Sequence, residues 1–357
     1  MDFGEGGMID FNSLGLAANL AIFAAAAAVV WVAGVHITRY ANVISVRTGI
    51  GQALVGMLLL GGVTSLPEVA VAVSAAAHGQ ATLAVNSVLG GVAMQVAILA
   101  IADVAIGKRA LTAVVPNPVV FLQGALKVFL LSVVASAIVV GDVAFLGIGL
   151  WMWLLLALFL FAMWTLSSTS TRRPWRVVDD EDLEGQEKRR AKQEAERQAS
   201  RGLGSTIVRA VIASAAIIVA GYVLSRTGDA IATQTGLGES FIGAVLVAIA
   251  TSLPEVSTVL TAVRSGLYTM AVSDIFGTNL FDVALLFVID AVAGGEPVLN
   301  SAGRFSTFAA VIGITTTMMF VAGVAERRDR AVLRMGIDSI GVLVTYLAGL
   351  VVLYFLR

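Results

Sequence analysis

About ten apolar stretches of roughly 20 residues recur along this chain, and each is long enough to cross the ~30 Å hydrocarbon core of a bilayer as a helix. The apolar character is continuous within each stretch, whereas the strands of a membrane barrel are shorter and alternate in hydropathy. The sequence therefore predicts an all-α membrane protein with about ten transmembrane helices. We place them near residues 15–38, 48–77, 81–105, 116–140, 143–167, 207–225, 238–264, 268–293, 303–324 and 334–356.

Composition agrees with a membrane-embedded chain and argues against several other classes of protein. Hydrophobic residues make up 58% of the sequence and charged residues 13%, the latter about half the share in soluble domains. The net charge is −1 and cysteine is absent, which argues against a nucleic-acid partner and excludes disulfides and thiolate metal sites. We expect the lipid bilayer and inorganic cations as partners and no bound cofactor; no sequence feature indicates an oligomeric state.

Lysine and arginine are concentrated in the loops on one side of the predicted membrane. With the N-terminus outside, the inner loops carry most of them, including ten between residues 172 and 209, whereas Arg226, Arg304 and Arg357 lie on the outer side. Positively charged loops are retained in the cytoplasm. We therefore expect a multi-pass protein of the cell membrane with both termini outside and a cytoplasmic segment over residues 168–206.

The segment 168–206 is the one soluble stretch of the sequence. Its charges recur at helical spacing, as in Glu184 with Lys188 and Glu194 with Arg197. Because charge runs of this kind are usually solvated, we interpret the segment as a solvated cytoplasmic helix that links the two halves of the chain. A regulatory element is the alternative, although the segment is too short for a domain with its own core.

The two halves of the chain match each other when one is shifted by 187 residues. The cores of the match, residues 54–103 and 241–290, align without a gap. Each half contains about five spans, and an odd number of spans inverts the second copy in the membrane. We therefore predict a first repeat over residues 1–167 and a second, inverted five-helix repeat over 207–357, an architecture typical of secondary transporters.

The pentapeptide Thr-Ser-Leu-Pro-Glu occurs in both cores, at 64–68 and at 251–255. Proline cannot donate the helical hydrogen bond and clashes with the carbonyl four residues earlier, so we expect loosened carbonyls near Val63 and Ala250. Such carbonyls are tolerated at membrane depth only beside a protein-lined cavity. The Thr, Ser and Glu of each copy share one helical face. Carboxylate, hydroxyl and carbonyl oxygens are the ligands that hard cations such as Ca²⁺ require.

Ionised carboxylates at membrane depth need a partner, because each costs ~2.5–3.5 kcal/mol even on the mild insertion scale. Lys127 is the only lysine or arginine that we place in the interior of a span, away from its ends. The sequence thus indicates a cation site at Glu68 and Glu255, the alternative being protonated glutamates that bond neighbouring helices. A second symmetric pair, Asp103 and Asp290, is interpreted as interface residues, with proton relay as the alternative.

At these residues the chain resembles the cation/Ca²⁺ exchanger superfamily, and most closely its sodium/calcium exchanger branch. That family has two inverted alpha repeats, each with a TSLPE-like motif on one helix and a G-S-N-x-F-N/D-like motif on the next. Residues 277–282 read Gly-Thr-Asn-Leu-Phe-Asp, close to the second motif. The resemblance implies that Glu68 and Glu255 hold Ca²⁺ at a central site. It also implies Na⁺ ligands among Thr64, Ser65, Thr251, Ser252, Thr278, Gln95, Asp282 and the backbone near Gly61 and Ala248.

The first repeat departs from the family pattern in its second motif, which reads Gly-Gly-Val-Ala-Met-Gln over residues 90–95. The serine hydroxyl is lost at Gly91, and the final asparagine is lengthened by a methylene at Gln95. The loss of one hydroxyl removes a ligand that the resemblance assigns to a flanking Na⁺ site. The Gly90–Gly91 pair itself predicts a close approach between helices.

Taken together, the residues and the resemblance predict a secondary active antiporter that exchanges Ca²⁺ for Na⁺ by alternating access. The altered first repeat keeps two alternatives open: an antiporter of Ca²⁺, or another divalent cation, with H⁺, and a non-transporting cation sensor. An intramembrane hydrolase would need a catalytic motif, and none surrounds the one symmetric aspartate pair. We therefore expect no enzymatic activity.

Overall fold

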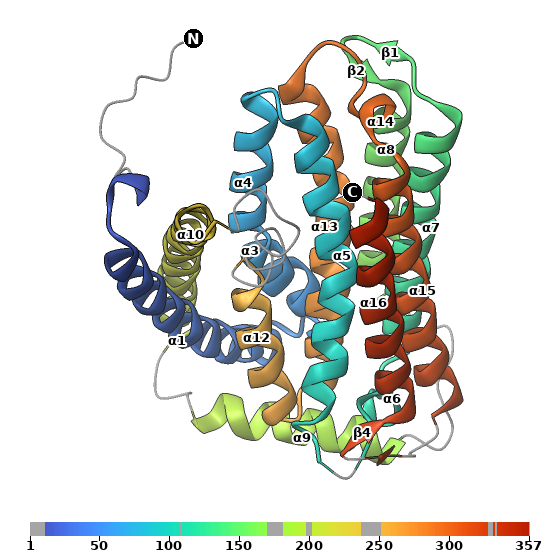
Figure 1. Cartoon of the computed structure of the whole chain (residues 1–357). Helices are drawn as coiled ribbons and strands as arrows, with labels where there is room; N and C mark the ends of the chain where they lie inside the picture. The colour runs from blue at the N-terminus through green and yellow to red at the C-terminus, as the bar shows by residue number, and fades with distance from the viewer. Residues whose placement is uncertain are drawn as a thin grey trace.

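The chain folds into a helical membrane bundle, shown in Figure 1 as a computed structural model. Its described residues are 11–107, 109–169, 181–197, 202–236, 251–327, 331–332 and 334–356. Within these ranges eight helices are long and apolar enough to cross a membrane, and the bent pair Gln52–Thr64 and Leu66–Ala77 adds a ninth. The predicted span 238–264 is described only from residue 251 onward. The prediction of an all-α membrane bundle is confirmed.

The first half of the chain begins with a short 3₁₀ turn and a 33-residue helix, which are η1 (Phe11–Ser13) and α1 (Leu16–Thr48). The rest of this half comprises α2 (Gln52–Val55), the π-helical η2 (Gly56–Gly61), α3 (Gly62–Thr64), α4 (Leu66–Ala77), α5 (Ala81–Asp103), α6 (Leu111–Val114), α7 (Val119–Val140), the hairpin strands β1 (Ala144–Phe145) and β2 (Ile148–Gly149), and α8 (Leu150–Thr169).

The helix α9 (Glu181–Arg197) precedes the second half. This half comprises α10 (Leu203–Gln234), α12 (Leu253–Arg264), α13 (Tyr268–Ala293), α14 (Val298–Ser301), α15 (Arg304–Glu326), the hairpin strands β3 (Ala331–Val332) and β4 (Met335–Gly336), and α16 (Ile337–Leu356). The two small hairpins were not predicted, because they occupy the ends of apolar stretches that were assigned entirely to helices.

The repeat extends over the whole described fold, well beyond the cores that match in sequence. Each described element of the second half begins 187 residues after its counterpart, apart from α15, which begins two residues early. The turns correspond as well: Gly49 ends α1 with φ 73°, and Gly236 follows α10 with φ 74°, a conformation that favours glycine. Figure 1 shows the inversion, since α14 and β1–β2 lie at one end of the bundle whereas α6 and β4 lie at the other.

The first TSLPE motif lies where the second span bends. The two helical pieces meet at Ser65 with a 45° change of direction. Pro67 occupies the first turn of α4, where its missing N–H would have no helical partner in any case. The preceding turn, η2, is π-helical, a geometry that is frequent at functional sites. The break therefore falls between a widened helix and a helix that starts anew.

Glycines let this broken helix approach α13 closely. A Cβ added at Gly56 would lie 2.7 Å from the Met270 carbonyl oxygen, and one at Gly277 would lie 2.6 Å from the Met57 Cα. Such contacts between backbones are the usual means of joining helices in lipid. An added Cβ at Gly90 or Gly91 meets no atom of the described residues within 4 Å. The segment that the repeat places opposite them, 237–250, lies outside the described residues.

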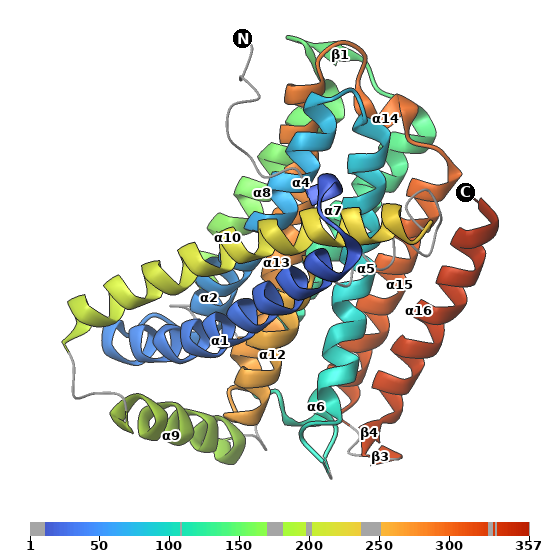
Figure 2. The same ribbon diagram turned by 60° about the vertical axis from the view of Figure 1, so that its left-hand side comes forward.

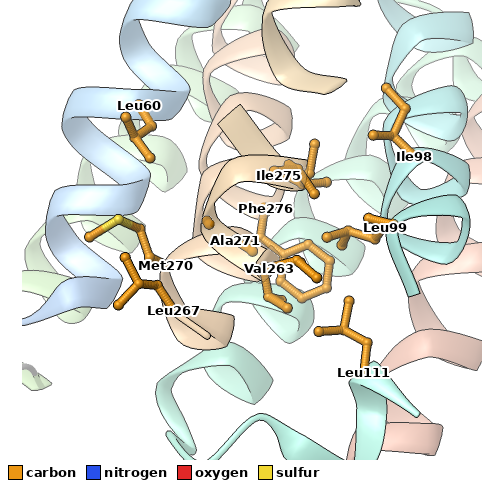
Figure 3. Packing of buried hydrophobic residues seen from close by; sticks show 14 of the residues in the cluster. Leu60, Ile98, Leu99, Leu111, Val263, Leu267, Met270, Ala271, Ile275 and Phe276 are labelled. Carbon is orange, nitrogen blue, oxygen red and sulfur yellow. The ribbon is translucent and has the colours of Figure 1, made fainter. Parts of the chain in front are cut away.

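Apolar side chains fill the space between the broken helix, α5 and α13. Leu60, Leu99, Leu111 and Phe276 are all fully buried in one cluster, and Figure 3 shows them converging from different elements. Inside a bilayer this burial stabilises the bundle through close packing rather than through removal of water. The cluster thus fixes the broken helix against α13.

Two long helices, α1 and α10, run obliquely across the other spans. Figure 2 shows them side by side and inclined to the remaining bundle, and they share the most extensive helix–helix contact of the fold. Both are longer than the ~20 residues that span a bilayer perpendicularly, having 33 and 32 residues, which agrees with their inclination.

The linker helix α9 is docked on the bundle along one face, while residues such as Lys188 and Lys192 are exposed, as the interpretation of a solvated linker helix predicts. Its predicted ion pair Glu184–Lys188 forms at 2.6 Å, but Glu187 is buried and accepts hydrogen bonds from the Thr269 N–H and hydroxyl, each at 2.7 Å. Asn42 of α1 donates to the Ala191 carbonyl at 2.8 Å. Figures 1 and 2 show α9 lying across the ends of α1 and α12.

The symmetric aspartates join one repeat to the other, as the interface interpretation predicts. Asp103 accepts hydrogen bonds from the Leu111 N–H at 2.5 Å and, in the other repeat, the Gly336 N–H at 2.6 Å. Asp290 does the same with Val298 at 2.7 Å and Gly149 at 2.6 Å. All four partners are related by the 187-residue repeat. Both oxygens of each carboxylate accept a backbone N–H, an arrangement that favours the interface role over proton relay.

Candidate functional site

The motif side chains of both repeats meet beside α5 and α13, near the break before α4 and the start of α12. On the first-repeat side, Gln95 connects two carboxylates: its amide nitrogen donates to Glu68 at 3.3 Å and to Asp282 at 3.1 Å. Gln95 is fully buried, Asp282 nearly so, and Glu68 is partly exposed. Gln95 and Asp282 are equivalent positions of the two repeats, 187 residues apart, and their side chains are in direct contact.

Three hydroxyl groups converge on the carbonyl of Gly61, at the end of the π-helical turn. Ser65 donates to it at 2.7 Å, and Thr64 and Thr278 each lie 3.4 Å from it. The Thr64 and Thr278 hydroxyls are themselves 3.3 Å apart. A hydroxyl–carbonyl cluster of this kind offers several neutral oxygens to one small region. The resemblance implies this carbonyl as a ligand; it also accepts the helical hydrogen bond from the Ser65 N–H at 3.1 Å, so it is not one of the loosened carbonyls that the proline predicts near Val63.

On the second-repeat side, Glu255 is fully buried at the start of α12, and neither carboxylate oxygen has a hydrogen-bond partner among the described residues. The Ser252 hydroxyl and one oxygen of Asp282 are likewise without a partner there. Thr251 is buried beside them. Ala248, the last backbone position that the resemblance implies, lies outside the described residues. Buried oxygens of this kind are costly unless a cation or a proton satisfies them.

The four acidic side chains of this region interact electrostatically. Glu68 is repelled by the charges of Asp282 and Glu255, and Glu255 is repelled by those of Asp274 and Asp282. Asp274 lies slightly deeper, where Thr258 donates to one of its oxygens at 2.5 Å. Within the described ranges, no three carboxylate or imidazole groups come close enough to hold one metal ion by themselves. A cation here has to be held by few carboxylates together with hydroxyl, amide and carbonyl oxygens.

One buried cation accompanies these acids. Lys127 of α7 has no solvent exposure, and its Nζ lacks a hydrogen-bond partner in the described part of the chain. The Nζ lies 5.7 Å from the centre of the Phe276 ring and interacts electrostatically with Asp282. Its repeat counterpart is Ile314, so this charge breaks the symmetry of the site. The sequence identified Lys127 only as a basic residue within a span, because nothing in its neighbours indicates which helix it faces.

Two inverted helical repeats with a broken helix and buried, unpartnered oxygens between them are typical of the fold of a secondary transporter. The family model described as "Sodium/calcium exchanger protein" matches residues 18–170 and 205–355, which are the two repeats. The chain therefore belongs to the sodium/calcium exchanger protein family.

Individual relatives share parts of the sequence or the fold. The Inner membrane protein YrbG of Escherichia coli (strain K12) is 26% identical over 252 residues, which cover 71% of this chain and 73% of that protein. The Sodium/calcium exchanger MaX1 of Methanosarcina acetivorans is 29% identical over 85 residues, 24% of each chain. The solved structure of the sodium-calcium exchanger NCX_Mj soaked with 10 mM Na⁺ and zero Ca²⁺ superposes with a TM-score of 0.69 at 14% identity, covering 94% of this chain and 99% of that one.

Proposed function

We propose that this protein is a secondary active antiporter that exchanges Ca²⁺ for Na⁺ across the cell membrane by alternating access. The observation that carries the proposal is the set of buried oxygens contributed by both repeats: the unpartnered carboxylate of Glu255, the Gln95-linked carboxylates, and the hydroxyls gathered on Gly61. Hard cations prefer such ligands. The names of MaX1 and NCX_Mj, both sodium/calcium exchangers, support the same choice of ions.

Competition for shared carboxylates supplies the physical basis of exchange. A divalent cation neutralises Glu68 and Glu255 together, and two monovalent cations can do the same. With neither bound, the buried charges oppose any motion that closes the site to water. Reorientation is therefore restricted to the loaded states, which couples the movement of one ion to that of the other.

The first repeat favours a second candidate, in which H⁺ replaces Na⁺ as the coupling ion. Gly91 lacks the hydroxyl that the corresponding residue, Thr278, supplies in the second repeat. Gln95 presents its amide nitrogen, a donor, to both Glu68 and Asp282. A site with fewer oxygen ligands holds Na⁺ less well, whereas a proton needs only a carboxylate.

Ion flux into proteoliposomes tests both candidates. Vesicles containing the purified protein are loaded with Na⁺ and diluted into Na⁺-free medium containing Ca²⁺; in parallel, a pH gradient of equal magnitude is imposed without Na⁺. Ca²⁺ uptake driven by the Na⁺ gradient is the expected result. Uptake driven only by the pH gradient would show that H⁺ rather than Na⁺ is the coupling ion. Absence of uptake in both, with other divalent cations also inactive, would refute transport and leave the cation sensor.

Removal of either glutamate charge tests the site itself. Glu68→Gln and Glu255→Gln should each abolish Ca²⁺ uptake, because each removes one of the two glutamate charges that the proposal assigns to neutralising the divalent cation. Glu296→Gln is the matched control, since Glu296 is exposed in the loop between α13 and α14. Wild-type uptake by either site variant would show that Ca²⁺ binds elsewhere.

The orientation of the protein in the membrane belongs to the same proposal. Arg39, Arg109, Arg264 and Arg327 lie toward the end of the bundle that carries α6, α9 and β4. By the positive-inside rule this end faces the cytoplasm and both termini face outward. Labelling of single cysteines introduced into α9 and at residue 12 with an impermeant thiol reagent in intact cells checks this, because the chain has no native cysteine. Labelling of α9 from outside would reverse the assignment.

A further inference from the structure

A cavity of about 480 Å³ lies on the α9 side of the bundle, away from the ion site. It is bounded by α1, α9 and the C-terminal end of α12. Four of the residues that line it are arginines: Arg39 from α1, Arg190 and Arg197 from α9, and Arg264 from α12. A cavity of this size is within the range of small-molecule sites. Three separate elements thus direct guanidinium groups toward one space.

The positive charge of this cavity is only partly balanced by the described residues. Glu194 is the one acidic residue that lines it, and its two oxygens face Arg39 at 4.0 Å and Arg197 at 3.8 Å. Arg190 contacts the Tyr268 hydroxyl at 3.4 Å and interacts electrostatically with the buried Glu187. Arg264 makes no ion pair within the described ranges. Like charges held at one cavity repel each other, so a bound anion would relieve a cost that the fold otherwise bears.

The helices that carry the arginines are held in place by contacts that do not involve the cavity. The buried bond from Glu187 to Thr269 and the bond from Asn42 to Ala191 fix α9 on both sides of Arg190. Arg264 ends α12, whose position is set by its packing against α1 and α13. Because the helices that carry the donors are positioned before a ligand arrives, binding need not order their backbones, although the side chains of Arg39 and Arg197 are 44% and 79% exposed.

We propose that this cavity, named here the α9 cavity and defined by Arg39, Arg190, Arg197 and Arg264, binds a phosphate-bearing anion at the cytoplasmic face. Arginine forks match phosphate oxygens in paired hydrogen bonds. Val35 of α1 also lines the cavity, and Val32, one turn earlier on the same apolar helix, is 56% exposed. A phosphate group can therefore reach the arginines either from the cytoplasm or from the headgroup of an anionic lipid. The bound anion joins α9 to α1 and α12.

Thermal unfolding of the purified full-length protein tests the proposal and separates the two sources. One arm titrates inorganic phosphate against sodium chloride at constant ionic strength in neutral detergent. The other compares nanodiscs of phosphatidylcholine with nanodiscs containing phosphatidylglycerol. The compared proteins are the wild type, Arg190→Gln/Arg264→Gln, and Lys192→Gln. The last is the matched control, since Lys192 is an exposed residue of the same helix outside the cavity.

Wild type and Lys192→Gln should show the same rise in melting temperature with the anion, whereas the double variant should need at least tenfold more anion for the same rise. A rise with phosphatidylglycerol alone identifies a lipid headgroup, and a rise with inorganic phosphate as well identifies the phosphate group as sufficient. Equal responses from the double variant and the control would overturn the proposal. Protection of the Thr269 amide from hydrogen exchange shows whether α9 is still docked in the double variant. Arg264→Lys, which keeps the charge but not the fork, should fall between the two.

Discussion

The reciprocal aspartates give a stability prediction that can be worked out from the structure. In Asp103→Asn, one carboxylate oxygen is replaced by an amide group that donates rather than accepts. The side chain can then satisfy only one of its two partners, Leu111 and Gly336. A hydrogen bond to a charged group contributes ~1.5–3 kcal/mol, and a buried N–H left without an acceptor costs ~1–3 kcal/mol, the two figures describing overlapping parts of one loss. We expect a destabilisation of about 2–4 kcal/mol.

The inverted repeat supplies an internal check on this magnitude. Asp290→Asn removes the same arrangement at Val298 and Gly149, at the opposite end of the bundle. The two single variants should therefore lose similar amounts of stability, and the double variant should lose their sum to within about 0.5 kcal/mol, because the sites share no partner. Asp229→Asn is the control: Asp229 is exposed on α10, and its replacement should change the free energy by less than about 0.5 kcal/mol.

The assay is reversible denaturation in mixed micelles, followed by tryptophan fluorescence, with Ca²⁺ flux measured on the same preparations. If the aspartates hold the repeats together, transport per folded molecule persists while stability falls. A proton relay predicts the opposite, with flux abolished and stability unchanged. That second outcome would refute the structural role derived from the hydrogen bonds.

Three further predictions concern helix contact, linker docking and ion choice. Gly61→Ala should impair folding or flux, since its Cβ would lie 2.7 Å from the Thr278 nitrogen. Gly62→Ala should be tolerated, because the nearest atom to its added Cβ is 3.7 Å away. Equal expression and flux of the two variants would contradict the close approach at Gly61. Burial raises the pKa of Glu187 to about 7. Docking of α9 should therefore be fully favoured below pH 4.5, near the pKa of a free glutamate, and should weaken by on the order of 3 kcal/mol as the pH rises through 7. Spin-label distances from α9 to α1 would measure this loss, and a Glu187→Gln variant should show no such pH dependence. Gly91→Ser restores the missing hydroxyl and should increase the share of Ca²⁺ uptake driven by Na⁺; an unchanged dependence on Na⁺ would show that this hydroxyl is not a limiting ligand.

The sequence was sufficient for the helical class, the inverted repeat and the residues around the ion site, because each depends on a local signal. Long apolar runs predict spans, and the duplicated TSLPE motif identifies Glu68 and Glu255. The placement of Gln95 between Glu68 and Asp282 also agrees with the aligned repeats. The roles of these residues in binding ions stay predictions, which the flux measurements test.

Other features could not be predicted, since they depend on contacts between distant segments. Glu187 is one of many charged residues in its run, and only the bundle shows that it reaches Thr269 and docks α9. The repeats over 1–167 and 207–357 were predicted from the number of spans, but the match of individual turns outside the two cores was not, because the outer helices keep their lengths and turns but not their sequences: Gly147 and Arg334 both adopt positive φ at equivalent turns. The gathering of three hydroxyls on the Gly61 carbonyl could not be derived from the proline, because this carbonyl still accepts the helical hydrogen bond from the Ser65 N–H at 3.1 Å and is not a group that the proline frees.

The reciprocal contacts of Asp103 and Asp290 have a consequence for how the halves depend on each other. Each repeat supplies the carboxylate that completes a turn in its partner, as the subunits of a homodimer do at an isologous interface. In a homodimer of identical subunits one substitution changes both copies of the contact, whereas in this single chain each copy can vary alone. Lys127, Gly91 and α9 are such one-sided features, and they make the two ends of an otherwise symmetric scaffold different from each other.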